Sequence, residues 1–446
     1  MDKGNTKLSA PLLFITLVHL AWLLAALHLG NFYHGDSPDY LYLADNMLRG
    51  YYYAGNAALP LDVVKLTQRP PVYSFVLIVN KLFFGQKILP LVIFQNALSI
   101  FNILLIYNIF KRLFNAKNGI WYWLMVAAYP AQMYFADMVV CDMLFQTFAM
   151  LYCLAVLKNI QEKAVNRLGL MSLWLVLAFF TKPIVYPLLF IHTTFFLCCL
   201  WRRNRYLAGV MAVLVPLATM CGYGYWNKSR TGFYHISSVQ SMNMLRWNAA
   251  GLMRYREGAK ADSIMQLYYD TLATKKNLQE NYLYANETGK YLIKSHLFDY
   301  GVYHTRESVR FFIDPDKLGL ELFRTGIYGI IVQCTTPVNF VTELKSKGLL
   351  GAWHYIKSYT LLPLVLITII FNIIRIAGFI MFLAQRRLGW QLRLFLFCFV
   401  AYFAFVTGPV ANARYFLPVL LPMSAAAWVG LSAFFHGKKQ QIVPKP

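Results

Sequence analysis

The sequence predicts an all-α polytopic membrane protein with about ten transmembrane helices. Of its 446 residues, 58% are hydrophobic and only 14% are charged, whereas about 25% of the residues of soluble domains are charged. Many of the hydrophobic residues stand in runs of roughly 20, the length of helix that crosses a bilayer. The expected spans are residues 9–29, 88–110, 119–135, 140–157, 167–181, 183–200, 205–225, 359–384, 391–407 and 413–435.

The basic residues indicate how these spans are oriented. The chain has 42 Lys and Arg against 19 Asp and Glu, for a net charge of +23. Most of the cations form short clusters in alternate connections, such as Lys111-Arg112, Arg202-Arg203 and Lys438-Lys439. The positive-inside rule assigns such connections, and with them both termini, to the cytoplasmic side of the inner membrane. The excess charge then favours membrane lipids over nucleic acid as a partner.

This orientation requires that the short apolar stretch 71–85 lies in the membrane interface and does not cross. The first 225 residues then form a transmembrane module with interfacial helices in its first outer loop. Residues 226–358 form a mostly helical outer segment between spans 7 and 8. Residues 359–446 hold the last transmembrane helices and a short cytoplasmic tail.

A polar run, His34-Gly35-Asp36-Ser37-Pro38-Asp39-Tyr40, follows the first span and brings Asp36 and Asp39 to the outer surface. A carboxylate there serves as a general base, a metal ligand or a helix cap. Ser37-Pro38 has the pattern of an N-cap and a first helical residue. The sequence therefore predicts a helix over 39–53 that does not need Asp36 as its cap.

Two further acids, Asp137 and Asp142, lie between apolar spans, where a charge is costly and tends to be functional. Asp142, at the start of a span, is expected to face the same cavity as Asp36. Two carboxylates there suit either a divalent cation such as Mg²⁺ or Mn²⁺ or the activation of a hydroxyl.

Three cations, Arg69, Lys182 and Arg414, stand at span ends on the outer side. A single cation at such a position often extends harmlessly to the interface. Three together, against the positive-inside trend, indicate an anionic ligand such as a phosphate or diphosphate.

Taken in order, these motifs resemble those of GT-C glycosyltransferases, in particular the bacterial branch with the lipid A aminoarabinose transferases, relatives of the protein O-mannosyltransferases. The resemblance covers residues 10–235 and 400–435. It rests on Gly35-Asp36-Ser37-Pro38-Asp39-Tyr40, Arg69-Pro70-Pro71-Val72-Tyr73, Tyr129-Pro130 followed by Asp142, Thr181-Lys182-Pro183, and Ala413-Arg414-Tyr415. Many relatives carry two adjacent acids at the first motif, whereas here Ser37 follows Asp36.

The resemblance implies an enzyme that takes a sugar from a polyprenyl-phosphate donor and transfers it, with inversion, to a lipid, glycan or protein acceptor at the periplasmic face. Asp36 is implied as the general base or a metal ligand beside it, and Asp142 as the second acidic position. The residues expected to bind substrate are Asp39, Arg69, Tyr73, Asp137, Lys182, Arg414 and Tyr415.

Two other functions share many of these features. A polymerase or ligase of lipid-linked glycan also carries a large outer loop and essential arginines, but the first-loop Asp36 argues against it. A transporter or flippase usually shows paired halves and polar residues at the middle of the membrane. Here the polar groups gather at one surface.

Overall fold

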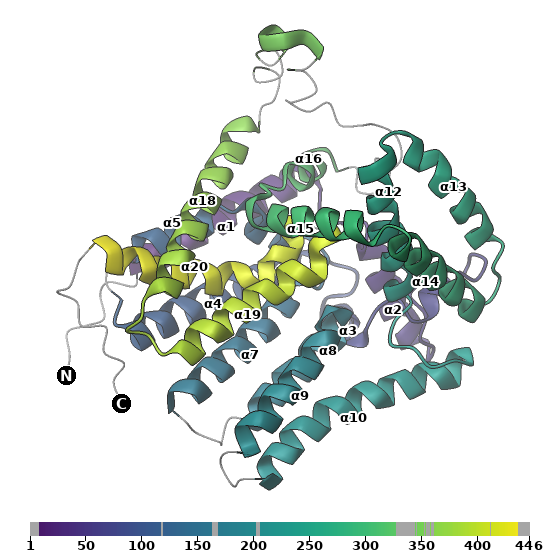
Figure 1. Cartoon of the computed structure of the whole chain (residues 1–446), viewed down its shortest axis with the longest axis horizontal. Helices are drawn as coiled ribbons and strands as arrows, with labels where there is room; N and C mark the ends of the chain where they lie inside the picture. Colours follow the sequence, from purple (N-terminus) through teal and green to yellow (C-terminus); the bar gives the residue numbers. More distant parts are fainter. Residues whose placement is uncertain are drawn as a thin grey trace.

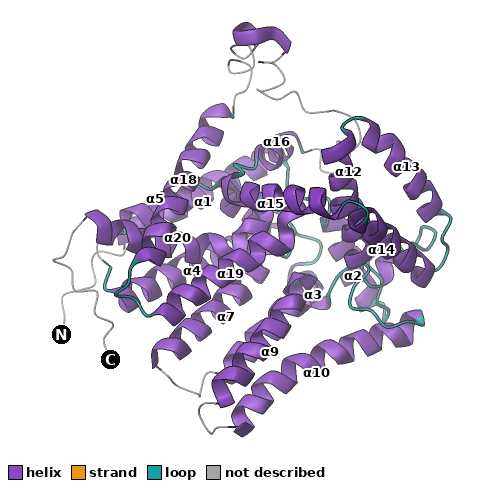
Figure 2. Cartoon of the chain, in the orientation of Figure 1, coloured by secondary structure: helices purple, strands orange, loops and turns teal. Residues whose placement is uncertain are grey.

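The computed structural model describes residues 9–116, 119–162, 168–201, 206–326, 344, 346–351, 353, 357, 361–410 and 412–435. Throughout this part of the chain the regular structure is helical, and it contains no strand (Figure 2). The predicted fold class, an all-α polytopic membrane protein, is confirmed. Part of the predicted outer segment, residues 327–343, lies outside the described residues.

Six helices in the described part of the chain are long and apolar enough to cross a membrane. They lie together in the bundle that Figure 1 shows. They are α1 (Ser9–Leu29), α4 (Leu89–Phe114), α7 (Asp142–Glu162), α18 (Leu362–Ala384), α19 (Trp390–Thr407) and α20 (Ala413–Phe435).

Helix α20 lies at the centre of this bundle and is almost entirely buried, because α4, α7, α18 and α19 all pack against it. Small residues allow the closest of these contacts. A Cβ atom on Gly430 of α20 would lie 2.1 Å from the carbonyl oxygen of Gly378 on α18. Glycine at both positions lets the two backbones approach, as small residues do in membrane helix pairs. The central helix is thereby fixed against α18.

The other four expected spans coincide with helices of different kinds. Residues 119–135 form two short helices, α5 (Ile120–Ala127) and α6 (Pro130–Asp137), because a residue before proline disfavours helical geometry. The remaining three are α8 (Leu168–Thr181), α9 (Tyr186–Trp201) and α10 (Tyr206–Thr231). The count of ten spans stays a prediction.

The first outer loop contains α2 (Ser37–Leu48), the 3₁₀ helix η1 (Val63–Leu66) and α3 (Pro71–Phe84). Helix α3 occupies the stretch predicted to lie in the interface. It packs on α2, with the rings of Tyr40 and Tyr73 edge to face at 5.0 Å. The predicted cap was wrong. Asp36, not Ser37, occupies the N-cap position of α2, and the Ser37 hydroxyl instead accepts a hydrogen bond from the His34 backbone N–H.

The part of the outer segment that is described is mostly helical, as predicted. Helix α15 (Leu297–Ile313) packs across the bundle against α18 and α19 (Figure 1). It also packs against the 3₁₀ turn η5 (Gly408–Val410). The helices of this segment are α11 (Val239–Asn243), the π-helix η4 (Met244–Ala249), α12 (Ala250–Glu257), α13 (Lys260–Ala273), α14 (Leu278–Lys294), α15 (Leu297–Ile313) and α16 (Lys317–Thr325).

Candidate active site

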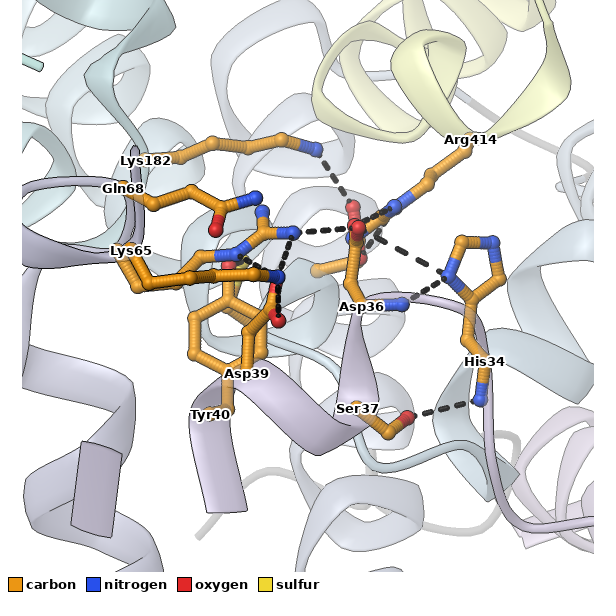
Figure 3. A network of polar contacts seen from close by, with 12 residues as sticks. His34, Asp36, Ser37, Asp39, Tyr40, Lys65, Gln68, Lys182 and Arg414 are labelled. Carbon is orange, nitrogen blue, oxygen red and sulfur yellow. Dashed lines mark hydrogen bonds and ion pairs between the residues drawn. The ribbon is translucent and has the colours of Figure 1, made fainter. Parts of the chain in front are cut away.

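Seven charged side chains form one continuous series of ion pairs in which cations and carboxylates alternate (Figure 3). We call this group the central ion-pair chain. In order, its members are Lys65, Asp39, Arg69, Asp36, Arg414, Asp142 and Lys182. All but Lys65 are predicted site residues, and they come from five separate regions of the sequence.

Helix ends assemble this chain. Asp36 occupies the N-cap position of α2, and Asp142 is the first residue of α7, where the positive end of a helix dipole favours a carboxylate. Arg69 lies just before α3, Lys182 directly follows α8, and Arg414 belongs to the first turn of α20. The ends of these helices therefore determine where each charged side chain lies.

Asp36 lies at the middle of the chain, with Arg414 on one side and Asp39 and Lys65 on the other (Figure 3). Arg69 Nη2 donates to Asp36 Oδ1 at 2.6 Å, and Arg414 Nη1 donates to Asp36 Oδ2. Although Asp36 occupies the N-cap position of α2, its carboxylate makes no capping hydrogen bond to the helix. Its side chain is 25% exposed, so Asp36 is the carboxylate of the chain that a substrate can reach most easily.

Asp142 is much more deeply placed, with a side chain only 2% exposed. Its two oxygens accept from Lys182 Nζ at 2.8 Å and from Arg414 Nε at 2.7 Å. Because a buried charge is stable only when it is paired, Asp142 fixes the positions of both cations. Lys182 also lies over the ring of Tyr415, 4.6 Å from its centroid.

The other end of the chain is built around Asp39. It accepts from Arg69 Nε at 3.1 Å, from Arg69 Nη2 at 2.8 Å and from Lys65 Nζ. Lys65, which lies in η1, was not predicted from the sequence. Like Arg69, it is a cation on the predicted outer side, and that signal could have identified it.

The matched family model covers part of this site. Residues 68–226 match the model described as dolichyl-phosphate-mannose-protein mannosyltransferase. Over this segment the match supports the predicted class, a GT-C membrane glycosyltransferase. The matched segment includes Arg69, Asp142 and Lys182, whereas Asp36 and Arg414 lie outside it.

The chain is also similar to two crystal structures of ArnT from Cupriavidus metallidurans. The structure bound to undecaprenyl phosphate gives a TM-score of 0.40 at 14% sequence identity, covering 94% of this chain and 78% of that one. The apo structure gives 0.37 at 13% identity, covering 94% and 77%. No curated protein matches the sequence.

The charges of the site are set by its ion pairs. Burial alone would raise the pKa of Asp36, but the guanidinium groups of Arg414 and Arg69 outweigh it and hold the pKa well below its usual range. Burial, reinforced by Arg414, lowers the pKa of His34 to about 4. His34 is therefore neutral at pH 7, and its contact with Asp36 at 3.9 Å is not an ion pair. Its Nδ1 instead accepts from the Asp36 backbone N–H at 3.2 Å.

Two predicted binding residues lie apart from the central ion-pair chain. Asp137 is fully buried at the end of α6, where one oxygen accepts from Asn96 Nδ2 at 2.8 Å. Burial raises the pKa of Asp137 to about 7. Tyr73 is also buried, and its hydroxyl donates to Gln95 Oε1 at 2.7 Å. The ring of Tyr73 contacts that of Tyr40, over which the Arg69 guanidinium lies at 5.0 Å from the centroid.

The donor set does not fit a divalent cation in this arrangement. Both oxygens of Asp36 and both oxygens of Asp142 already accept from Arg or Lys. The guanidinium of Arg414 lies between the two carboxylates, where a bridging metal ion would meet a like charge. Within the described ranges, no three His, Cys, Asp or Glu side chains are grouped to hold a metal. The residues in this arrangement therefore do not fit the Mg²⁺ or Mn²⁺ cofactor suggested by the sequence, a suggestion that stays untested.

Proposed function

We propose that this protein transfers a sugar from a polyprenyl-phosphate donor to a hydroxyl group of a lipid, glycan or protein acceptor, with inversion at the sugar. The observation that carries the proposal is the central ion-pair chain, in which the reachable carboxylate Asp36 lies between Arg69 and Arg414. The clusters of basic residues described above support a site on the periplasmic face of the inner membrane, with both termini in the cytoplasm.

The first step is binding of the donor phosphate. The central ion-pair chain holds four cations against three carboxylates, so it has one positive charge in excess. A polyprenyl-phosphate sugar is a phosphodiester with one negative charge, which this excess balances. Lys182, at one end of the chain, and the guanidinium of Arg414 supply charge-assisted hydrogen bonds to the phosphate oxygens.

Donor binding also prepares the base. Asp36 is a weak base while it holds two guanidinium groups, because they stabilise its charged form. A phosphate that draws Arg414 or Arg69 toward itself removes one of these partners. The proton affinity of Asp36 then rises once the donor is in place, which limits base catalysis to the loaded enzyme.

Transfer is a single displacement. The acceptor oxygen forms a bond to the anomeric carbon of the sugar, and the bond from that carbon to the phosphate oxygen breaks. The electron pair leaves with the polyprenyl phosphate, and the hydroxyl proton goes to Asp36. Attack opposite the leaving group inverts the anomeric centre, and the cations offset the charge that develops on the phosphate. Asp142 acts as a positioning residue for Lys182 and Arg414.

The test measures release of polyprenyl phosphate by protein in lipid nanodiscs, with a panel of polyprenyl-phosphate sugars. Loss of a general base typically costs about 10² to 10⁴ in rate, and Asp36→Asn should lose activity in that range. Asp45→Asn is the matched control, because Asp45 lies on the same helix and pairs with Lys81, outside the site. Equal turnover in the two variants would remove Asp36 as the base. No release from any donor by the wild type would direct attention to transport or polymerase assays.

A further inference from the structure

An open pocket of about 340 Å³ lies in the outer segment, and no member of the central ion-pair chain lines it. Its walls come from η4, α12 and α15, with Pro409 of η5 at one side. This volume falls at the lower end of the range of small-molecule sites. It can hold a headgroup of one or two sugar rings.

The lining is strongly basic. It contains four arginines, Arg246, Arg254, Arg306 and Arg310, and a single acid, Glu307. The side chains of Arg254, Arg306 and Arg310 are 56%, 69% and 58% exposed. Each also contacts a carboxylate: Arg254 that of Asp262, Arg306 that of Glu307, and Arg310 those of Glu307 and Asp314. Exposed guanidinium groups in such number fit an oxyanion, which arginine binds through paired N–H donors.

Aromatic side chains accompany the arginines. Trp247 and Tyr255 line the pocket and are 44% and 40% exposed. A large exposed ring carries a free-energy cost unless a ligand covers it, and its flat apolar face suits the C–H face of a sugar. The pocket therefore combines groups for an oxyanion with groups for a sugar ring.

Two features of the backbone support a ligand site here. Arg246 and Trp247 belong to η4, a six-residue π-helix, and π-helical turns are rare and occur frequently at functional sites. On the opposite wall, Tyr303 packs so closely on α12 that a Cβ atom at Gly251 would lie 2.0 Å from its hydroxyl oxygen. That hydroxyl donates to the Pro409 carbonyl at 3.4 Å, which ties α15 to η5.

The pocket also lies near the central ion-pair chain along the sequence. Pro409 lines it, and Arg414 follows five residues later. Five residues span at most about 18 Å, so a ligand of two or three sugar rings can reach from the pocket toward Arg414. An acceptor must lie beside the donor phosphate and not on it, and the pocket offers such a position.

We propose that this pocket binds the anionic saccharide of the acceptor, with its phosphate or carboxylate on the arginines and a sugar ring on Trp247 and Tyr255. This inference rests on the proposed function, and it names the acceptor class: an acidic glycan carried by a lipid or free in solution. An acidic glycan is favoured over a neutral one, because the four arginines of the lining outnumber the three carboxylates that pair with them, Asp262, Glu307 and Asp314.

Binding is tested with full-length protein in nanodiscs of neutral lipid, by calorimetric titration with glucose 1-phosphate, glucuronate, glucose and inorganic phosphate. We expect saturable binding of the two acidic sugars and none of glucose. The double variant Arg254→Gln/Arg306→Gln should weaken that binding at least tenfold. Arg256→Gln is the matched control, since Arg256 lies on the same helix but pairs with Asp299 outside the pocket. No saturable binding of either acidic sugar, or equal binding in the double variant, would overturn the proposal.

Further arms separate the sources of the anion. Trp247→Ala should weaken binding of glucose 1-phosphate but not of inorganic phosphate; equal affinity of the wild type for both would refute a sugar subsite. Adding phosphatidylglycerol to the nanodiscs tests a lipid headgroup, and competition for the pocket by this sugar-free lipid would contradict the saccharide assignment. Polyprenyl-phosphate binding is measured in parallel with Lys182→Ala. Failure there alone counts against the proposed function, whereas failure of the acidic sugars alone counts against the pocket.

Discussion

Asp36 and Asp142 lie on opposite sides of a single guanidinium group. Arg414 donates through Nη1 to Asp36 and through Nε to Asp142 at 2.7 Å. Asp36 is the N-cap of α2, Asp142 is the first residue of α7, and Arg414 lies in the first turn of α20. The Arg414 side chain therefore joins the first outer loop to two helices of the bundle. Movement of Arg414 toward an anion changes the environment of both carboxylates together.

Asp142→Asn should lower both stability and donor binding. The substitution leaves Lys182 and Arg414 without the carboxylate that pairs with them, and breaking a buried pair typically costs about 3–5 kcal/mol. We expect a lower melting temperature in nanodiscs and polyprenyl-phosphate affinity reduced at least tenfold. Asp137→Asn is the control, because Asp137 is equally buried but contacts Asn96 and no member of the chain. Similar donor affinity in both variants would show that Asp142 does not position the cations.

Lys182→Met should raise the KM for the donor more than it lowers kcat. A hydrogen bond to a charged group contributes about 1.5–3 kcal/mol, which corresponds to roughly 10- to 150-fold in affinity. The control is Lys81→Met, since Lys81 pairs with Asp45 on α2, away from the central ion-pair chain. A fall in kcat with an unchanged KM would instead place Lys182 at the transition state alone.

The sequence was sufficient to predict six of the seven members of the central ion-pair chain, but not Lys65 and not the pairing. Asp36, Asp142, Arg69, Lys182 and Arg414 are conspicuous because each lies near the end of an apolar stretch. Asp137 carries the same signal, yet it faces Asn96, because its direction depends on how α6 packs. Burial and partner choice are tertiary properties that neither spacing nor composition encodes.

The fold shows the same division. Six long apolar helices were predictable from length and hydrophobicity. The break between α5 and α6 had a local signal in Pro130, which the count of apolar residues over 119–135 overrode. The π-helix of Met244–Ala249 has no comparable sequence signal, and the basic pocket that it lines was therefore not predicted.

Chelation should leave transfer unchanged. With guanidinium and ammonium groups on all four oxygens of Asp36 and Asp142, no carboxylate oxygen of the pair is free for a metal ion. We expect polyprenyl-phosphate release with EDTA to remain within about twofold of the untreated rate, which corresponds to roughly 0.4 kcal/mol in activation free energy. Loss of activity that Mg²⁺ or Mn²⁺ restores would show that Arg414 leaves the carboxylates to admit a cation.

His34 should make the protein sensitive to acid. Burial lowers its pKa from 6.5 to about 4 in the folded protein, so below pH 6.5 the unfolded chain binds a proton that the folded site does not. Stability that is present above pH 6.5 is then lost as the pH falls toward 4. His34→Gln should flatten the dependence of melting temperature on pH between 6.5 and 4. The exposed His28 supplies the control variant His28→Gln, and an identical pH profile in His34→Gln and wild type would contradict a neutral His34.

Substitution of Arg375 should lower the stability of the fold without changing donor binding. It is fully buried in α18, where it donates to Ser424 Oγ at 2.9 Å, to the Met125 carbonyl at 2.6 Å and to Asn372 Oδ1. Arg375→Met preserves much of the volume but leaves three acceptors unsatisfied, each at a cost of about 1–3 kcal/mol. We expect a melting temperature lower by several degrees while the KM for the donor stays unchanged, because Arg375 contacts no member of the central ion-pair chain among the described residues. A selective rise in donor KM at unchanged stability would instead require that α18 transmits its packing to the site through α20.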